Sequence, residues 1–461
     1  MSVSNRSLSS LEDIPVNGIV KGPLGEAINN YLQSLEKESF FRGSVMVIKA
    51  GLPILCKGYG NATESSKNTP FTIFQIASLT KQFTAAAILQ LHERGKIDLD
   101  APITEYLPED YQSEDWEYVK VKHLLSHTSG IPSYTDQKNY EKIAKSLTVE
   151  KIIKDAIDKT LYFEPGTEFE YSNTGYILLG TIIENVTGES YAQYMAENIF
   201  KPADMQSSGV CTGSSAKGSN VATGYCWDDD GEKLIKDDSE NYSVSFSDGS
   251  IYSTVIDLAK WNEVLDGKRK DILNDEAIRM MTTPKKEEYG CGLIINEVFG
   301  QKRIFHDGMI AGFNDFLCKY PNDDTFIVVL CNTVGISSER VCAEISQILY
   351  LPKNEQHIPI PFPQGFDFKP YLKTFKSKSE DTKGEEYKFT QEDNRLYVEG
   401  PWDDTTEVAL LANGRLLLLV DGYNPEMGEE YELDKDGNLT VYDSYGEETD
   451  YLVANKKHFF F

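Results

Sequence analysis

The sequence predicts an α/β (α+β) protein with an antiparallel sheet flanked by helices, a helical insertion, and a small C-terminal antiparallel β-barrel. Apolar runs of strand length occur near the N-terminal end, at 43–59, and again at 289–330. Helical patterns dominate between them, and we expect the insertion from about 97 to 240. After residue 368, short alternating segments are separated by Asn-Gly and Asp-Gly pairs, at 413, 421 and 436, which are typical of hairpin turns.

Length and these patterns predict two domains. The chain has 461 residues, of which 40% are hydrophobic, which is enough for more than one core. We expect a loose Ser-rich segment at 1–20, a first domain at 21–352, an extended Pro-rich linker at 353–367 and the β-barrel domain at 368–461.

Charge and cysteine content limit the partners and the location. The formal net charge of -28 disfavours nucleic acids and anionic membranes, because these partners require basic patches. The N-terminal residues have no apolar segment, and no later run reaches the roughly 18 apolar residues of a membrane span, so we expect a cytoplasmic protein. The seven cysteines include no C-x-x-C pair, so we expect them to be free thiols and expect neither a zinc site nor a cofactor.

The elements of the first domain follow in order. An amphipathic helix is expected at 23–41, followed by two hairpin strands at 43–48 and 54–59. The domain should end with successive strands and a closing helix, at 289–295, 303–306, 314–318, 326–330 and 339–350. We expect these late strands to pair with the early hairpin, so that both ends of the domain build one sheet.

A serine and a lysine at the start of the first apolar helix form the candidate catalytic pair. Residues 85–91 are strong helix formers, so Ser78 should lie at or near the first turn, with Lys81 on the same face. A desolvated lysine with a lowered pKa can take the proton of a serine, and the N-H groups at a helix start suit an oxyanion. The tetrad Ser-x-x-Lys also begins at Ser34 and Ser214, so it identifies a site only together with further motifs.

Two further blocks follow Ser78-Leu79-Thr80-Lys81 in the chain. They are His123-Leu124-Leu125-Ser126-His127-Thr128-Ser129-Gly130-Ile131-Pro132 and Tyr171-Ser172-Asn173. With these blocks, residues 20–350 resemble the serine β-lactamase and penicillin-binding-protein superfamily, in particular its class C-like branch of D-aminopeptidases, esterases and DD-peptidases. Residues 368–461 resemble the lipocalin-like domain appended to some of these peptidases.

The resemblance implies a role for each residue of the first and third blocks. Ser78 would be the acylating nucleophile, Lys81 its proton partner and Tyr171 the second member of the acid/base set. A phenolate beside an ammonium is stabilised and can act as a base. Asn173 would hydrogen-bond the substrate amide, since its side chain offers both a donor and an acceptor. Without a catalytic role, Tyr171 would be a tyrosine of the core and Asn173 would be the N-cap of a helix.

The resemblance also implies that His306-Asp307-Gly308 lines the pocket opposite the serine, on a sheet edge. Gly308 would let the substrate backbone approach closely, and the N-H of Met309 with that of the serine would form the oxyanion hole. Asp307 departs from the family pattern of a small or hydroxyl residue, which weakens recognition of a substrate carboxylate. We predict that Asp307 selects an amine-bearing substrate, unless it turns away from the pocket or pairs with Arg303.

His123 and His127 have the spacing of two metal ligands on a helix. A catalytic zinc site normally takes three protein ligands, and no third candidate lies nearby in the sequence. We therefore expect both histidines to satisfy backbone groups where the helix ends near Gly130.

Together these observations predict a serine hydrolase that forms an acyl-enzyme on Ser78. The substrate would be a small amide, a short peptide or an ester, and the activity that of a D-aminopeptidase-like peptidase. Homo-oligomerisation through the C-terminal domain is also expected. The alternatives are a catalytically silent scaffold or filament-forming protein with the same fold, and a β-lactam-binding or β-lactam-hydrolysing protein.

Overall fold

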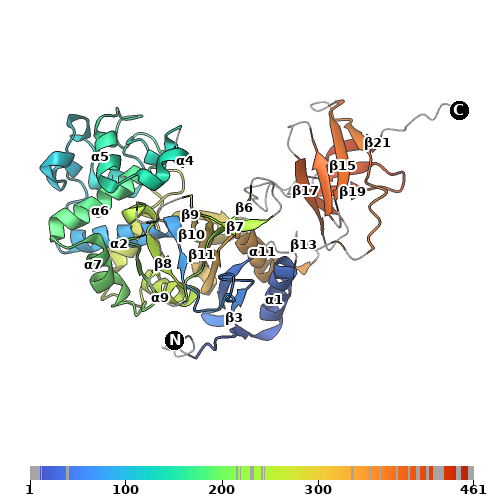
Figure 1. Ribbon diagram of the computed structural model, residues 1–461, viewed down its shortest axis with the longest axis horizontal. Helices are drawn as coiled ribbons and strands as arrows, with labels where there is room; N and C mark the ends of the chain where they lie inside the picture. Colours follow the sequence, from blue (N-terminus) through green and yellow to red (C-terminus); the bar gives the residue numbers. More distant parts are fainter. Residues whose placement is uncertain are drawn as a thin grey trace. The chain divides into compact units, whose positions relative to one another are not determined.

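The computed structural model describes residues 11–454, except 12, 38–40, 139, 214, 215, 217, 219, 229–232, 240, 241, 243, 334–336, 354, 355, 357, 361, 363, 364, 380–382, 393, 394, 401–404, 412–414, 419–429 and 443–447. Its helices and strands are labelled in Figure 1. The chain divides into two compact units, one of residues 1–29 and 35–338 and one of residues 30–34 and 339–461.

A seven-stranded antiparallel sheet forms the centre of the first unit. Its strand order is β1-β3-β2-β12-β11-β10-β9. The late strand β12 pairs with β2 of the early hairpin, for example Val328 with Met46, so the two ends of the unit build one sheet as predicted. The strands are β1 Ile19–Val20, β2 Gly43–Lys49, β3 Leu52–Tyr59, β9 Ile294–Val298, β10 Gln301–Ile310, β11 Phe313–Tyr320 and β12 Thr325–Cys331.

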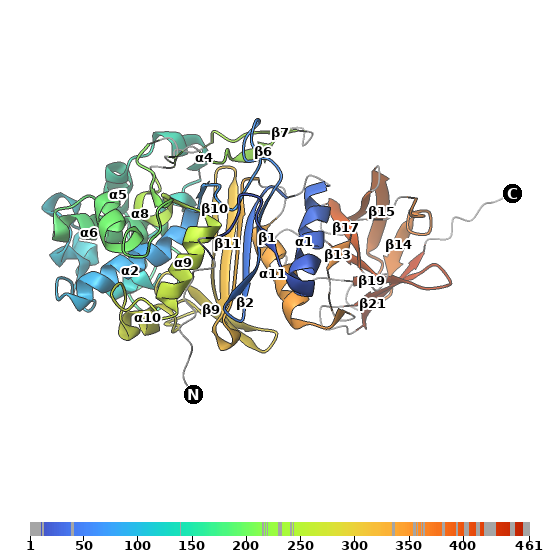
Figure 2. The ribbon, with the colours of Figure 1, turned by 90° about the horizontal axis from the view of Figure 1, so that it is seen from below.

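Helix α2 and the helices of the insertion cover one face of this sheet (Figures 1 and 2). Every residue of α2 from Thr80 to Leu91 is buried, because the helix lies inside this layer. The side chains of Thr148, Ser172, Ser190 and Thr254 accept a backbone N-H and thereby start α5, α6, α7 and α9. The helices are α1 Gly22–Lys37, α2 Thr80–Glu93, α3 Val121–Leu125, α4 Tyr140–Ile143, α5 Val149–Ile157, α6 Asn173–Thr187, α7 Tyr191–Met195, α8 Phe246–Gly249, α9 Val255–Leu265, α10 Asp275–Met281 and α11 Ser338–Tyr350.

Two small sheets accompany the helical layer. One has the order β4-β8-β5 and contains Phe74–Gln75, Ile251–Ser253 and Gly209–Val210; the other is the hairpin of β6 Tyr225–Trp227 and β7 Leu234–Lys236. Strand β4 leads directly into the short 3-10 turn η1, Ala77–Leu79, and then into α2. The expected extended segment before Ser78 is therefore present.

Two segments differ from the sequence-based expectation. In the segment predicted to be loose at 1–20, Leu11 and Ile14 are buried in the core and Ile19–Val20 pair with β3, because apolar side chains there have a core to enter. The strand predicted at 289–295 begins only at Ile294. The residues before it turn past α2, where Gly292 has a φ of +72° and a Cβ would lie 2.6 Å from the backbone oxygen of Lys81.

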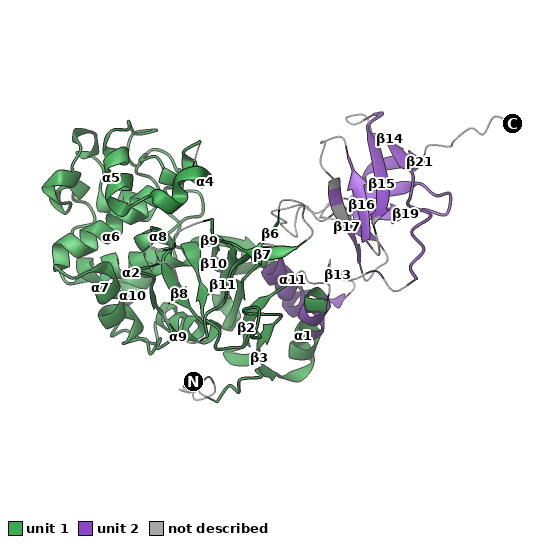
Figure 3. Ribbon diagram, in the orientation of Figure 1, with its two compact units in different colours: residues 1–29, 35–338 green, residues 30–34, 339–461 purple. Residues whose placement is uncertain are grey.

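The second unit contains a curled antiparallel sheet, which confirms the predicted small barrel (Figure 3). Strands β14 to β21 each pair with the next strand in the chain, and β14 pairs with β21, so the pairing closes on itself. Phe375, Phe389 and Tyr431 are among its buried core residues. The strands are β13 Pro359–Ile360, β14 Thr374–Ser377, β15 Glu386–Glu392, β16 Arg395–Glu399, β17 Thr405–Leu411, β18 Leu416–Leu418, β19 Glu430–Leu433, β20 Leu439–Tyr442 and β21 Glu448–Ala454.

The stretch predicted as a linker at 353–367 contributes to this second unit. Pro359–Ile360 pair with β17, and Phe362 belongs to the barrel core. Of the predicted hairpin turns, Asp436-Gly437 connects β19 and β20, with Gly437 at a φ of +80°. The pairs at 413–414 and 421–422 lie outside the described residues. Among the described helices, none is both long enough and apolar enough to cross a membrane.

Candidate active site

Ser78 lies in the turn η1 between β4 and α2, two residues before the helix begins at Thr80. The preceding residue, Ala77, has a φ of +43°, in the left-handed region that residues with a Cβ rarely adopt. Such strain persists only where the surrounding structure over-determines it. Ala77 is buried, and the turn η1 packs against β10, β11 and α8, which holds Ser78 in this position.

Lys81 is the partner of Ser78. Its Nζ donates a hydrogen bond of 2.8 Å to Ser78 Oγ and one of 2.9 Å to the backbone oxygen of Asp248. The side chain is 0% exposed. Burial lowers the pKa of Lys81 to about 8, against the opposing attraction of the Asp248 and Asp307 carboxylates. An amine with this pKa is partly uncharged near neutral pH and can accept the serine proton.

Tyr171 faces the same pair. Its ring lies under the Lys81 ammonium, with Nζ 4.9 Å from the ring centroid. Burial raises the pKa of Tyr171 well above its usual value, with further contributions from Tyr289 and Asp307, while a hydrogen bond with Ser78 acts in the opposite direction. The phenol is therefore protonated at neutral pH and suits a proton donor or relay. The phenolate base expected from the sequence is not the resting form, because burial outweighs the nearby ammonium.

Asn173 begins α6, but it does not cap that helix. Ser172 does so, since its Oγ accepts the N-H of Gly175 at 3.2 Å. The Asn173 Nδ2 group donates to Thr135 Oγ1 at 3.2 Å, while its buried Oδ1 has no hydrogen-bond partner among the described residues. The Asn173 side chain thus retains an acceptor for a substrate N-H. The alternative role predicted for Asn173, capping the helix, is carried out by Ser172.

Strand β10 brings its predicted residues to the serine. A Cβ on Gly308 would lie 2.7 Å from the backbone oxygen of Ile76 and 3.3 Å from the backbone N of Ser78, so only glycine permits this approach. Strand β9 pairs with β10 only as far as Phe305. The segment from His306 onward therefore has an edge without a partner strand in the described part of the chain, as the predicted pocket wall requires.

His306 is buried and uncharged. Its Nδ1 lies 2.7 Å from the backbone oxygen of Asp307, which can only accept, so Nδ1 carries the proton and Nε2 accepts from the Tyr289 hydroxyl at 3.0 Å. Burial lowers the pKa of His306, partly offset by Asp307. This wall of the site therefore lacks a positive charge at neutral pH.

Asp307 lies at the rim of the site. Its side chain is 61% exposed, and Oδ1 is 3.7 Å from His306 Nδ1. The predicted alternative, a pair with Arg303, is not formed: the Arg303 Nε donates to Asn296 Oδ1 at 3.0 Å. The carboxylate is close enough to raise the pKa of both Lys81 and Tyr171. Met309, two residues further along β10, is 72% exposed.

The family model described as Beta-lactamase matches residues 29–347 of the chain. The protein belongs to this beta-lactamase family. It is 29% identical over 335 residues to the putative penicillin-binding protein PbpX of Bacillus subtilis, covering 72% of this chain and 79% of that protein. It is also 29% identical over 336 residues to Protein flp of Staphylococcus aureus strain MW2, covering 70% of this chain but only 63% of that protein.

Solved structures support the same assignment of fold. The octameric penicillin-binding protein homologue from Pyrococcus abyssi matches with a TM-score of 0.69 and 26% identity, covering 94% of this chain and 100% of that one. The D-amino acid amidase from Ochrobactrum anthropi SV3, complexed with D-phenylalanine, matches with a TM-score of 0.62 over 71% of this chain and 99% of that one; at 24% identity this likeness concerns the fold alone. The family resemblance predicted from the sequence is confirmed.

Three groups around this beta-lactamase-family site were missed by sequence reasoning: the Asp248 carbonyl, the Tyr289 hydroxyl and the His127 ring. Asp248 lies in a segment to which no element or motif was assigned, and Tyr289 lies in a segment predicted only as a strand. His127 was assigned a backbone role, which it has, since its Nδ1 accepts the N-H of Ser172 at 3.0 Å. His123 likewise accepts the N-H of Lys120 at 3.2 Å. The described residues contain no group of three or more His, Cys, Asp or Glu side chains placed to hold a metal ion.

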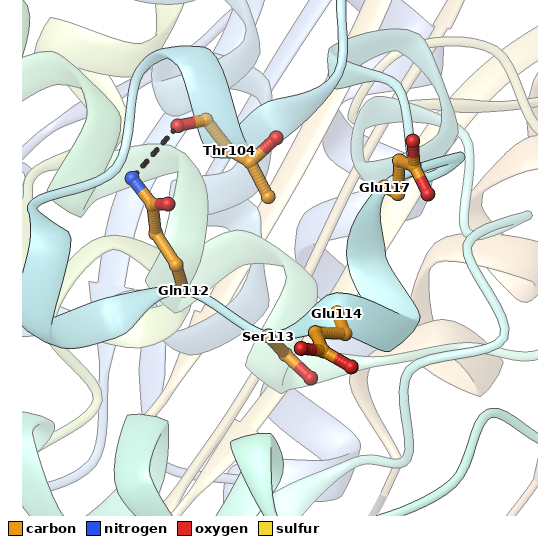
Figure 4. A pocket seen from close by; sticks show the side chains of 5 residues that line it. All are labelled: Thr104, Gln112, Ser113, Glu114 and Glu117. Carbon is orange, nitrogen blue, oxygen red and sulfur yellow. Dashed lines mark hydrogen bonds between the residues drawn. The ribbon is translucent and has the colours of Figure 1, made fainter.

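A separate pocket of about 430 Å³ opens on the insertion (Figure 4). It is lined by Thr104, Gln112, Ser113, Glu114 and Glu117. Gln112 Nε2 donates to the backbone oxygen of Thr104 at 3.1 Å and closes one side of the pocket. None of these five side chains belongs to the catalytic set of the family, so the chemistry is assigned to the surroundings of Ser78.

Proposed function

We propose that this beta-lactamase-family protein is a serine hydrolase that forms an acyl-enzyme on Ser78 and acts on small amides or esters. The observation that carries the proposal is the 2.8 Å hydrogen bond between Ser78 Oγ and Nζ of a fully buried Lys81 whose pKa is lowered to about 8. At pH 7 about a tenth of such an amine is uncharged, whereas an ordinary lysine is almost wholly charged.

In the proposed acylation, uncharged Lys81 takes the proton of Ser78 while Oγ forms its bond to the substrate carbonyl carbon. The backbone N-H groups of Ser78 and Met309 stabilise the negative charge that develops on the carbonyl oxygen. As the bond to the leaving amine or alcohol breaks, Tyr171 donates its phenolic proton to that group and is reprotonated by Lys81. Water then attacks the acyl carbon and loses a proton to the same pair, while Ser78 Oγ regains a proton and the acid product leaves.

The charges of the site favour a substrate with an amino group near the scissile bond. His306 is uncharged, and Asp307 places an exposed carboxylate on the rim. A carboxylate there attracts an ammonium and repels the carboxylates of penicillins and D-alanyl peptides. The D-amino acid amidase of similar fold is also described in complex with L-phenylalanine amide, at 25% identity to this chain; that molecule is an amide with a free amino group and no carboxylate, which supports an amine-bearing amide as the substrate class.

Covalent labelling tests the proposed function. The wild-type protein is treated with a fluorophosphonate probe, and the modified peptide is identified by mass spectrometry. We expect the label on Ser78 and its loss in Ser78→Ala, with hydrolysis of an activated ester reduced by about 10³ or more. Ser34→Ala is the matched control, because Ser34 begins another Ser-x-x-Lys tetrad but donates its hydroxyl within helix α1. An unlabelled Ser78 in a folded protein would favour the silent-scaffold alternative.

A second experiment tests the proposed role of Asp307. Free-amine, N-acylated and carboxylate-terminated forms of one chromogenic amide are compared on wild type and Asp307→Thr. At ~4 Å and an effective dielectric of about 20 the raw interaction is about 4 kcal/mol, and a third of that gives about tenfold selectivity. We expect the variant to lose this preference for the free amine. The same ranking of substrates in both proteins would rule out charge selection.

We also propose that the protein self-associates. The homologue from Pyrococcus abyssi that the chain matches over 94% of its length is described as octameric. Light scattering after size-exclusion chromatography measures the mass in solution, and a single monomeric mass across a range of concentrations would reject the proposal.

A further inference from the structure

His127 occupies a strained and buried position beside the catalytic tyrosine. It lies two residues beyond the end of α3, with a φ of +54° and only 1% of its surface exposed. A histidine in the left-handed region costs of order 1 kcal/mol, and such residues gather where the geometry is needed for function. The sequence-based role, satisfying backbone groups, explains neither the strain nor the aromatic surroundings.

Three contacts tie His127 to the segment that carries Tyr171. Its backbone oxygen accepts the N-H of Glu170 at 2.9 Å, and its Nδ1 accepts the N-H of Ser172 at 3.0 Å. Its ring stacks on Tyr171 with 4.2 Å between the centroids and 33° between the planes. One residue thus holds the backbone on both sides of Tyr171 and also covers one face of the phenol.

The hydrogen bond to Ser172 fixes the protonation state of His127. Because Nδ1 accepts, the neutral ring must carry its proton on Nε2. Tyr176 and Tyr289 lie 5.1 and 4.6 Å away, centroid to centroid, and complete an apolar enclosure with Phe169. Burial, with Lys81 and His306 nearby, holds the pKa of His127 well below its usual value. The tie to Ser172 therefore persists across the neutral pH range.

We propose that His127 is a positioning residue for Tyr171, acting through the Ser172 N-H and the stacked ring, and not through the substrate. The inference rests on the proposed function, in which Tyr171 moves a proton between Lys81 and the leaving group. Displacement of a reacting group by about 1 Å can cost about 10² in rate, so a loss of either contact should lower kcat. KM should change little, because His127 does not contribute a group to substrate binding.

Two variants separate the two contacts. His127→Asn places Oδ1 where Nδ1 was and tolerates the left-handed backbone, so it keeps the acceptor and loses the ring. His127→Phe keeps the ring and leaves the Ser172 N-H without its acceptor. His123→Asn is the matched control, because His123 also accepts a backbone N-H through Nδ1, from Lys120. We expect each His127 variant to lower kcat for a chromogenic amide, whose leaving amine needs the Tyr171 proton, by about 10 to 10² with KM near wild type, and the control to leave both near wild type.

A double-mutant cycle distinguishes positioning from a general structural role. If His127 acts through Tyr171, His127→Asn should lower kcat far less in a Tyr171→Phe background than in the wild type. The same fold loss in both backgrounds, or a wild-type kcat in both single variants, would overturn the proposal. A drop in melting temperature alone is not a supporting result, since the control is expected to show one as well.

A structural measurement decides the question without turnover. Crystal structures of wild type, His127→Asn and, where it folds, His127→Phe give the distance between the Tyr171 hydroxyl and Ser78 Oγ. We expect a displacement of about 1 Å or a split conformation of Tyr171 in at least one variant. Unchanged Tyr171 positions refute the positioning role, even if Ser78 labelling succeeds. An unlabelled Ser78 in wild type refutes the proposed function and leaves this structural comparison as the deciding test of His127.

Discussion

The pH dependence of acylation follows from the titration of Lys81. The base in the proposed mechanism is the uncharged amine, and the pKa of Lys81 is lowered to about 8. About a tenth of the enzyme is then active at pH 7, half at pH 8 and nine tenths at pH 9. We expect kcat/KM for an activated ester to rise about tenfold between pH 7 and 9 and then to level.

Two substitutions test this titration, one by removing the titrating base and one by moving its pKa. Lys81→Arg keeps the charge but cannot release a proton, so activity should fall by about 10³ or more at every pH. In the wild type, the Asp307 carboxylate stabilises the Lys81 ammonium and raises the pKa of Lys81. Asp307→Asn removes this carboxylate. Without it the ammonium is less stable, the pKa of Lys81 falls, and the midpoint of the rise should move to lower pH.

The assay is the kcat/KM profile from pH 5.5 to 10, after subtraction of spontaneous hydrolysis. Asp100→Asn is the matched control, because the Asp100 carboxylate is exposed and pairs with Lys122 on the surface. It should leave the midpoint unchanged. A wild-type midpoint below about pH 6.5, or an upward shift in Asp307→Asn, would refute the assignment of Lys81 as the titrating base.

Three further outcomes are expected. Gly308→Ala should abolish Ser78 labelling while the protein stays folded, and should lower kcat/KM by about 10² or more. The reason is that the new Cβ would lie 3.3 Å from the backbone nitrogen of Ser78. Labelling at the wild-type rate would show that the site tolerates a side chain at position 308. Ala77→Gly should raise the free energy of unfolding in urea by about 0.5 to 1 kcal/mol, because glycine adopts the left-handed conformation without strain. It should also lower kcat, because Ser78 is held less firmly. A less stable variant would show that packing of the Ala77 methyl group outweighs the strain. Truncation after Pro352 should leave a cooperatively unfolding fragment of residues 1–352, which retains α11 and still reacts with the fluorophosphonate. An insoluble product would show that the barrel belongs to the same folding unit.

Local sequence rules predicted much of the fold and one half of the site. Period-two apolar runs located β2, β3, β11 and β12, and turn pairs indicated the barrel. The three-residue spacing of Ser78 and Lys81 was sufficient to predict their contact, because residues three apart on a helix share a face. Motif resemblance, and not spacing, supplied Tyr171 and the strand of His306.

The remaining contacts of the site arise from packing between distant segments. The Asp248 carbonyl reaches Lys81 because α8 packs on α2, and Tyr289 reaches His306 because the chain turns before β9. Neither residue lies in a periodic pattern that points to the site. His127 shows a further limit: its motif was noticed, but its partner Ser172 lies 45 residues away, and no local rule joins the two. The burial that keeps Tyr171 protonated is likewise a property of the packed enclosure.

The strand order of the large sheet has a consequence for synthesis of the protein. β12, the last strand of the sheet to leave the ribosome, lies between β2 and β11. The hairpin of β2 and β3 is therefore synthesised early, but β2 cannot pair with β12 until the intervening residues have been translated. This takes roughly tens of seconds at usual elongation rates. During that interval β2 exposes an apolar edge, which is a hazard for aggregation. The wall of the Ser78 site, β10, also arrives late, so a nascent chain carries Ser78 and Lys81 long before the site that the proposed acylation requires is complete.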